Sequence, residues 1–149
     1  MTLANGIETQ DIEVWTEGSK IVFVGKPKAE ELDGKVFECE YDLKGNLLMP
    51  SFKNAHTHSA MTFLRSYADD MPLQDWLFKQ IFPMEAKLDG EKVYWLTKLA
   101  ILEYLTTGCT AAFDMYFELD DYVKACIESG FRSVLCGACV KACPKSIIE

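Results

Sequence analysis

The sequence predicts an α/β fold from residue 47 onward, preceded by a smaller region of short strands. From residue 47 the chain alternates strand-like apolar runs with helical stretches in the order β, α, α, β, α, β. Parallel strands need a crossover connection, usually a helix, so this order favours a parallel sheet. With 149 residues, 49% of them apolar, the chain can bury a core. We expect two regions, residues 1–49 and residues 50–149.

The first region reads as short strands and turns. Residues 12–14 and 21–24 are apolar-rich runs with Gly18 between them, which predicts a β-hairpin. Residues 37–43 alternate strictly between apolar and acidic side chains, which predicts a strand with one buried face. A turn at residues 44–46 follows.

The second region begins with an expected strand that runs from residue 47 to His56 and His58, with polar residues at its C-terminal end. A helix is expected over residues 73–82. The pattern then predicts a longer helix over residues 90–107.

The ends of this longer helix carry sequence signals. Asp89 is a good N-cap and Gly108 a good residue after the last turn. Its apolar side chains cover most of the circumference, so it is expected to pack on several sides.

The remaining elements follow the same alternation. We expect a strand at residues 110–116, a helix from about residue 120 to 129 ended by Gly130, and a strand at residues 131–135. Three strands of one parallel sheet are therefore predicted after residue 46.

Charge and hydropathy exclude two classes of partner. Fifteen basic and 23 acidic side chains give a formal net charge of −8, and no Lys/Arg cluster stands out, so we expect no nucleic-acid binding. No run of about 18 apolar residues predicts a membrane span. The first residues show no secretory leader, and we expect a cytoplasmic protein.

His56 and His58 are the only histidines of the chain, two residues apart on the expected strand. Side chains at this spacing project from one face of a strand, where both imidazoles can reach one metal ion. The alternative is that the pair only hydrogen-bonds neighbouring backbone groups.

Four segments carry a resemblance to a known family. Residues 48–58 (LMPSFKNAHTH) resemble the first barrel strand of the amidohydrolase superfamily. Residues 59–77, 81–88 and 110–117 are similar to the branch whose members deaminate S-adenosylhomocysteine and 5-methylthioadenosine. The resemblance covers residues from about 7 to 135.

The resemblance implies a fold and a set of roles. It implies the first three strands of a metal-dependent-hydrolase (β/α)8 barrel, preceded by part of a small β-sandwich. His56 and His58 would be ligands of a catalytic zinc, or of iron in some relatives. Glu85 would bind the ribose hydroxyls of a nucleoside substrate, and Trp76 would line its pocket. Without the resemblance, Glu85 reads as an acid at a helix N-terminus and Trp76 as a core aromatic.

The implied reaction is hydrolytic deamination, in which a metal ion activates water for attack on C6 of an adenine ring and ammonia leaves. The other zinc deaminase class needs a Glu two residues after its ligand histidine and a P-C-x-x-C segment. Here His58 follows His56 at that spacing and Leu135 precedes Cys136, which excludes that class.

The chain also departs from the family. A complete barrel needs about 250 residues, and the family's later ligands, an Asp and a further His, have no positions here. Where relatives place a substrate-binding Arg, this sequence has Cys136 and Gly137. We therefore expect the 149 residues alone to be inactive, with the barrel completed by self-association or by a missing remainder.

Two alternatives to catalysis remain open. One is a non-catalytic assembly module that keeps the family's architecture. The other is iron–sulfur binding, because Cys136, Cys139 and Cys143 have the spacing of the end of a bacterial ferredoxin run. That run has a fourth cysteine, and Ser133 occupies its position here, so we do not expect a [4Fe–4S] cluster.

Overall fold

The computed structural model describes residues 12–137. The chain divides into two compact units, Met1–Pro50 and Ser51–Glu149. We call them unit 1 and unit 2 and describe each by itself.

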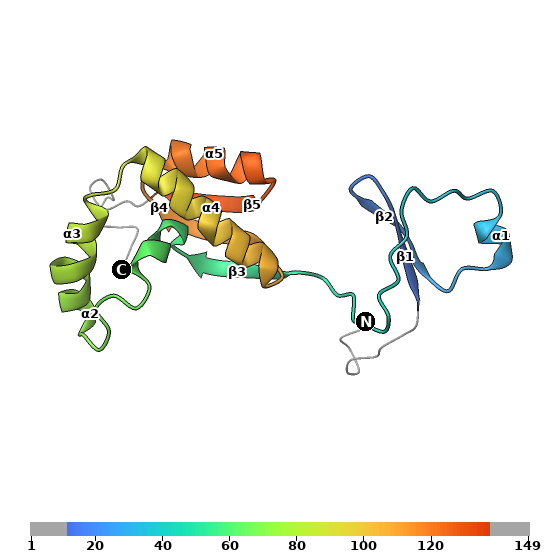
Figure 1. Ribbon diagram of the computed structural model, residues 1–149, viewed down its shortest axis with the longest axis horizontal. Helices are drawn as coiled ribbons and strands as arrows, with labels where there is room; N and C mark the ends of the chain where they lie inside the picture. Colours follow the sequence, from blue (N-terminus) through green and yellow to red (C-terminus); the bar gives the residue numbers. More distant parts are fainter. Residues whose placement is uncertain (1–11, 138–149) are drawn as a thin grey trace, which may run out of the picture. The chain divides into compact units, whose positions relative to one another are not determined.

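Unit 1 contains a β-hairpin (Figure 1). Strands β1 (Glu13–Glu17) and β2 (Lys20–Gly25) pair antiparallel across a tight turn, in which Gly18 has a φ of +57°. Glycine adopts this left-handed conformation without steric cost, which suits a two-residue hairpin connection. The rings of Trp15 and Phe23 stack at 4.3 Å between centroids. The hairpin prediction is confirmed, and the short helix α1 (Ala29–Leu32) follows it.

One strand prediction in unit 1 is wrong. Residues 37–43 have no regular secondary structure. Phe37 packs its ring against Trp15, 5.1 Å between centroids, and Asp42 Oδ1 accepts a hydrogen bond from the backbone N–H of Lys44, which bends the chain. Strict alternation therefore did not suffice, because a strand also needs a hydrogen-bonded neighbour and the described sheet of unit 1 has only two strands.

Unit 2 is built on a parallel sheet of three strands (Figure 1). Strand β3 (Phe52–Thr57) pairs with β4 (Cys109–Tyr116), which pairs with β5 (Arg132–Gly137), all in the same direction. The α/β class with a parallel sheet is thus confirmed. The strand expected from residue 47 to the histidines is confirmed from Phe52 onward: it starts five residues later than expected, His56 lies on it and His58 directly follows it.

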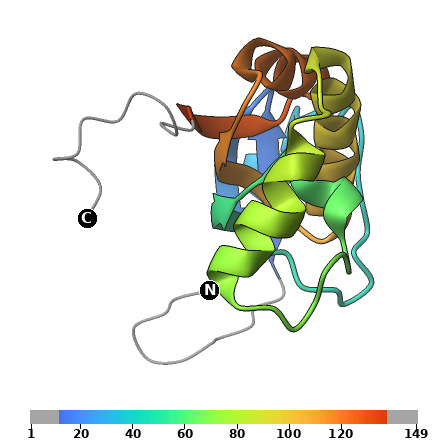
Figure 2. The ribbon, with the colours of Figure 1, turned by 90° about the vertical axis from the view of Figure 1, so that its left-hand side faces the viewer.

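Two helices connect these strands and lie side by side (Figures 1 and 2). Helix α4 (Gly90–Thr106) begins at Asp89, whose side chain accepts a hydrogen bond from Lys92 N, as predicted. Helix α5 (Leu119–Ser129) ends at Gly130, with a φ of +63°. Lys98 of α4 donates to Ser129 of α5 at 3.1 Å.

The segment between β3 and α4 is helical in short pieces. A 3₁₀ helix, η1 (Ser59–Leu64), follows His58. The helix expected at residues 73–82 is continuous from α2 (Leu73–Asp75) through a π-helical stretch, η2 (Trp76–Ile81), to α3 (Phe82–Glu85). Among the described residues, no helix combines the length and apolarity that a membrane span requires.

The core of unit 2 lies between the sheet, α4, α5 and η1. Its buried residues come from all of these elements. The expectation that every apolar face of α4 is packed is wrong, because four of its apolar side chains remain 44–61% exposed in the structure: Trp95, Leu99, Leu102 and Leu105. The cluster consists of Ala60, Val93, Ile101, Ala112, Tyr116, Tyr122, Cys126 and Phe131.

Candidate metal centre

The two histidines lie together at the carboxyl end of β3. His56 is exposed, His58 is half-buried, and their ring centroids are 5.0 Å apart with the planes at 82°. Two imidazoles that share a tetrahedral metal ion at about 2.0–2.1 Å have ring centres about 5 Å apart. The spacing of the two rings therefore fits ligation of one ion.

A hydrogen bond sets the tautomer of His58. Its Nδ1 lies 2.8 Å from the backbone oxygen of Met115 in β4. A carbonyl oxygen only accepts hydrogen bonds, so Nδ1 carries a proton, and in the neutral ring Nε2 is then the nitrogen with a lone pair for a ligand. Metal-binding histidines commonly donate their second ring nitrogen to a carbonyl in this way, so the donor set fits a metal ion.

Glu85 approaches the same site from the end of α3. Its Oε1 accepts a hydrogen bond of 2.9 Å from the hydroxyl of Tyr116, the last residue of β4. Burial raises the pKa of Glu85, while the Tyr116 hydrogen bond and the nearby His58 act in the opposite direction. The pKa of Tyr116 is raised by burial and then by the charge of Glu85. A carboxyl group with a fixed orientation therefore lies beside the histidine pair.

The structure brings His56 and His58 together and places Glu85 within electrostatic range of His58, whereas Trp76 occupies a different setting. Trp76 begins η2 and is half-buried. It lines a shallow hollow whose other residues come from the preceding loop and the first residue of α2: Ala68, Asp69, Asp70, Met71 and Leu73. Its role in a nucleoside pocket stays a prediction.

The described residues bring no third ligand to the two imidazoles. Among residues 12–137 no group of three or more His, Cys, Asp or Glu side chains is placed to hold one ion. Cys136 lies on β5, and Cys139 and Cys143 lie outside the described residues, so the iron–sulfur alternative is not tested.

Two residues that form hydrogen bonds with the neighbours of His58 were not predicted from the sequence. Asp114 and Tyr104 contact the residues that flank His58, and both belong to elements far from it in the sequence. A buried Asp in the middle of an apolar strand was the available signal, because such a group needs hydrogen-bond donors.

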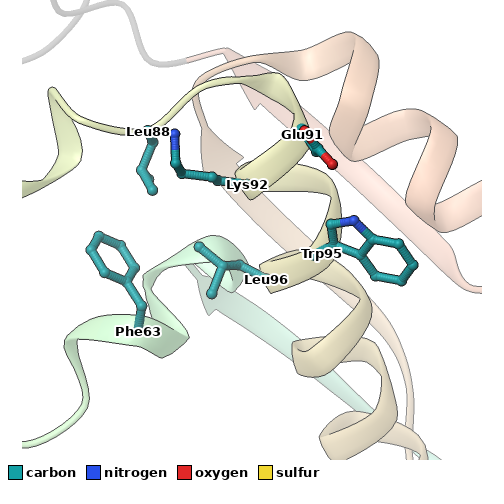
Figure 3. A pocket seen from close by; sticks show the side chains of 6 residues that line it. All are labelled: Phe63, Leu88, Glu91, Lys92, Trp95 and Leu96. Atoms are coloured by element: carbon teal, nitrogen blue, oxygen red, sulfur yellow. The ribbon is translucent and has the colours of Figure 1, made fainter.

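A second hollow, with a volume of about 430 Å³, lies at the start of α4 (Figure 3). Phe63, Leu88 and Leu96 point toward one another across it, and Lys92 extends above them (Figure 3). Its lining is mainly apolar, and Trp95 on its border is 61% exposed. The histidines and Glu85 do not line this hollow.

The sequence pattern of the amidohydrolase family matches residues 47–147. The chain belongs to the amidohydrolase family. This assignment agrees with the resemblance seen in the sequence and with the parallel sheet that carries the histidine pair at its carboxyl edge.

Curated relatives match most of this chain. It is 56% identical over 137 residues to a 5'-deoxyadenosine deaminase of Methanospirillum hungatei, covering 90% of this chain and 30% of that protein. It is 48% identical over 117 residues to a 5-methylthioadenosine/S-adenosylhomocysteine deaminase of Syntrophomonas wolfei, covering 76% of this chain and 27% of that protein. The chain thus spans less than a third of the length of these relatives.

Solved structures show the same fold. An adenosine deaminase of Xanthomonas campestris with bound zinc superposes with a TM-score of 0.68 at 32% identity, over 85% of this chain and 29% of that one. The zinc complex of an atrazine chlorohydrolase of Arthrobacter aurescens gives a TM-score of 0.72 at 20% identity, over 87% and 31%. The second likeness concerns the fold alone.

Proposed function

We propose that this chain is the N-terminal part of a metal-dependent hydrolase that deaminates an adenosine-type nucleoside, such as S-adenosylhomocysteine or 5-methylthioadenosine. The observation that carries the proposal is the pair of imidazoles, 5.0 Å apart at the end of a parallel strand, in a member of the amidohydrolase family. Relatives named as deaminases of such nucleosides support the substrate class. The overall reaction replaces the exocyclic amine at C6 with oxygen from water and releases ammonia.

His56 and His58 are the proposed metal ligands, and zinc is the proposed ion because the zinc-bound adenosine deaminase has a similar structure. A divalent ion bound there supplies Lewis acidity and makes water a nucleophile near neutral pH. His58 contributes Nε2, because Met115 O holds the proton on Nδ1.

Glu85 is the proposed partner of the ribose hydroxyls. A carboxylate has about four acceptor positions, and Tyr116 uses one of them on Oε1. The remaining positions can accept hydrogen bonds from a pair of adjacent hydroxyls. Tyr116 holds the carboxyl group in one orientation before the substrate arrives, which lowers the entropic cost of binding. Trp76 is the proposed aromatic wall of the nucleoside pocket.

The rest of the site must come from residues beyond this pair. A catalytic zinc has three protein ligands and an open position, and two neutral imidazoles hold the ion only weakly. We propose that unit 2 provides the first three strands of a (β/α)8 barrel, that residues 1–49 are part of a small β-sandwich, and that the 149 residues alone do not catalyse deamination.

A zinc titration of the purified chain tests the ligand pair. We expect weak binding by calorimetry that disappears in the double variant His56→Ala/His58→Ala. Cys136→Ser is the matched control for zinc capture by thiols and should bind as the parent does. Micromolar or tighter binding that survives the double variant would contradict the proposal.

A measurement of ammonia release tests the proposal that the 149 residues alone do not catalyse deamination. The chain incubated with zinc and 5-methylthioadenosine should release none above the rate of the double histidine variant. Turnover by the 149 residues that depends on His56 and His58 would show that the isolated chain is active.

A further inference from the structure

The residues on both sides of His58 are held from outside their own strand. Ser59, which follows His58, is 2% exposed, and Asp114 of β4 is fully buried. The Ser59 backbone N–H donates to Asp114 Oδ2 at 3.1 Å, and the Ser59 hydroxyl donates to the same oxygen. One buried carboxyl group thus holds one residue of the chain by two hydrogen bonds.

Tyr104 of α4 adds a second contact to the same turn. Its hydroxyl is hydrogen-bonded to Ser59 Oγ at 2.9 Å and to Thr57 Oγ1 at 2.5 Å. Thr57 lies between the two histidines and Ser59 directly after them. Both neighbours of His58 are therefore tied to a single phenol group.

The cost of burying these groups argues that the arrangement is specific. A carboxyl group removed from water is strongly unfavourable unless donors satisfy it, and a partly satisfied polar network is worse than an apolar core. Ser59 donates to the Asp114 side chain through its backbone N–H and its hydroxyl, and the Tyr122 hydroxyl of α5 also interacts with this carboxyl group. In this strand an apolar residue would fill the space without needing such donors.

Three consecutive residues of β4 each hold a different part of the candidate site. Asp114 holds Ser59, the Met115 carbonyl holds His58 Nδ1, and Tyr116 holds Glu85. The Met115 bond forms only while the backbone around His58 keeps the ring beside β4. A contact that fixes Ser59 and Thr57 therefore also controls the direction of the His58 ring.

We propose that Asp114 and Tyr104 are positioning residues that fix the turn after β3, so that His58 keeps its proton on Nδ1 and presents Nε2 to a ligand. The importance of that presentation for a metal ion rests on the proposed function. The orientation of the ring itself does not depend on it.

The direct test is the tautomer of His58 in the metal-free chain, read from ring ¹⁵N chemical shifts by NMR. The variants are Tyr104→Phe, which removes only the phenol oxygen, and Asp114→Asn, which keeps the side-chain size. We expect the Nδ1–H signature of His58 in the parent and a mixture of both tautomers in the variants. Tyr94→Phe is the matched control, because Tyr94 lies on the same helix and its hydroxyl bonds Glu128 instead.

Zinc affinity provides the second readout. Loss of outer hydrogen-bonding partners of metal ligands typically costs about 10–100-fold in affinity, so we expect at least about tenfold weaker zinc binding in Tyr104→Phe and no change in Tyr94→Phe. A folded Tyr104→Phe variant with the parent tautomer of His58 would overturn the inference.

Folding and the proposed function are controlled separately. Any variant that loses its helical circular dichroism is replaced by Ser59→Ala, which removes the hydroxyl that Tyr104 and Asp114 both contact. An unchanged His58 signature in that variant also overturns the inference. If the parent does not bind zinc through its histidines, the proposed function fails, whereas the tautomer measurement still decides the positioning role.

Discussion

Units 1 and 2 contain similar kinds of apolar residue but use them differently. Among the described residues, every fully buried apolar side chain belongs to unit 2. In unit 1, Ile21 is 67% exposed and Val36 is 95% exposed, although both lie in segments with an apolar pattern. An apolar side chain stabilises a fold only when a second layer covers it.

The difference follows from topology. Unit 2 places α4 and α5 against a parallel sheet, which buries residues from every element. Unit 1 offers a two-stranded sheet and a helix of four residues, and an isolated hairpin is marginally stable in water. Three predictions test this contrast, two with matched substitutions in the two units and one with a native cysteine from each unit.

The largest expected effect comes from truncating a buried isoleucine. Ile101 of α4 is 2% exposed inside the core cluster, and its replacement by Ala should lower the free energy of unfolding by about 2–5 kcal/mol. Ile21→Ala in β2 makes the same chemical change on an exposed side chain and should cost less than about 0.5 kcal/mol. Urea unfolding followed by far-ultraviolet circular dichroism, to which the helices of unit 2 and the hairpin of unit 1 both contribute, measures the two losses. Equal losses in the two variants would show that the hairpin is covered in solution.

The labelling rates of two cysteines should also differ between the units, with a smaller effect than the isoleucine substitutions. Burial raises the pKa of the Cys126 thiol, and the side chain is 7% exposed, whereas Cys39 is exposed. The thiolate is the reactive form, and a buried thiol also needs local opening before it meets a reagent. Cys126 should therefore react with iodoacetamide at least about tenfold more slowly than Cys39.

Peptide mass spectrometry after timed quenching distinguishes the two thiols. Labelling in urea is the control and should bring both rates together. Similar rates without urea would mean that unit 2 opens as readily as unit 1.

The sequence predicted unit 2 well because its signals are local. The Asp89 cap and the glycines at 108 and 130 bound α4 and α5 within one residue of the expected limits. The strand expected at residues 37–43 is absent, and the strand that leads to the histidines starts at Phe52 and not at residue 47, because pairing depends on a partner strand, which the apolar pattern does not reveal.

The candidate site shows the same division between local features, which the sequence reveals, and long-range contacts, which it does not. The His-x-His spacing and the family resemblance predicted which imidazoles come together, and the structure places them 5.0 Å apart. Asp114 and Tyr104 stayed hidden because their contacts span 55 and 45 residues of sequence. Such hydrogen bonds are created by packing of α4 and β4 around η1 and leave no periodic pattern.

The smallest expected effect is a gain in stability when a buried hydroxyl without a hydrogen-bond partner is removed. Thr97 of α4 is fully buried. Its Oγ1 has no hydrogen-bond partner among the described residues. Valine has nearly the same shape without the polar atom, so Thr97→Val should raise the free energy of unfolding by about 1 kcal/mol.

Thr16→Val in β1 is the matched control in unit 1. Thr16 is exposed, and water satisfies an exposed hydroxyl, so the free energy of unfolding should change by less than about 0.5 kcal/mol. Urea denaturation with both variants in parallel measures the two changes. A loss of stability in Thr97→Val would show that a bound water or a rotated side chain satisfies the hydroxyl in solution. The core of unit 2 would then contain a polar contact that its packing alone does not reveal.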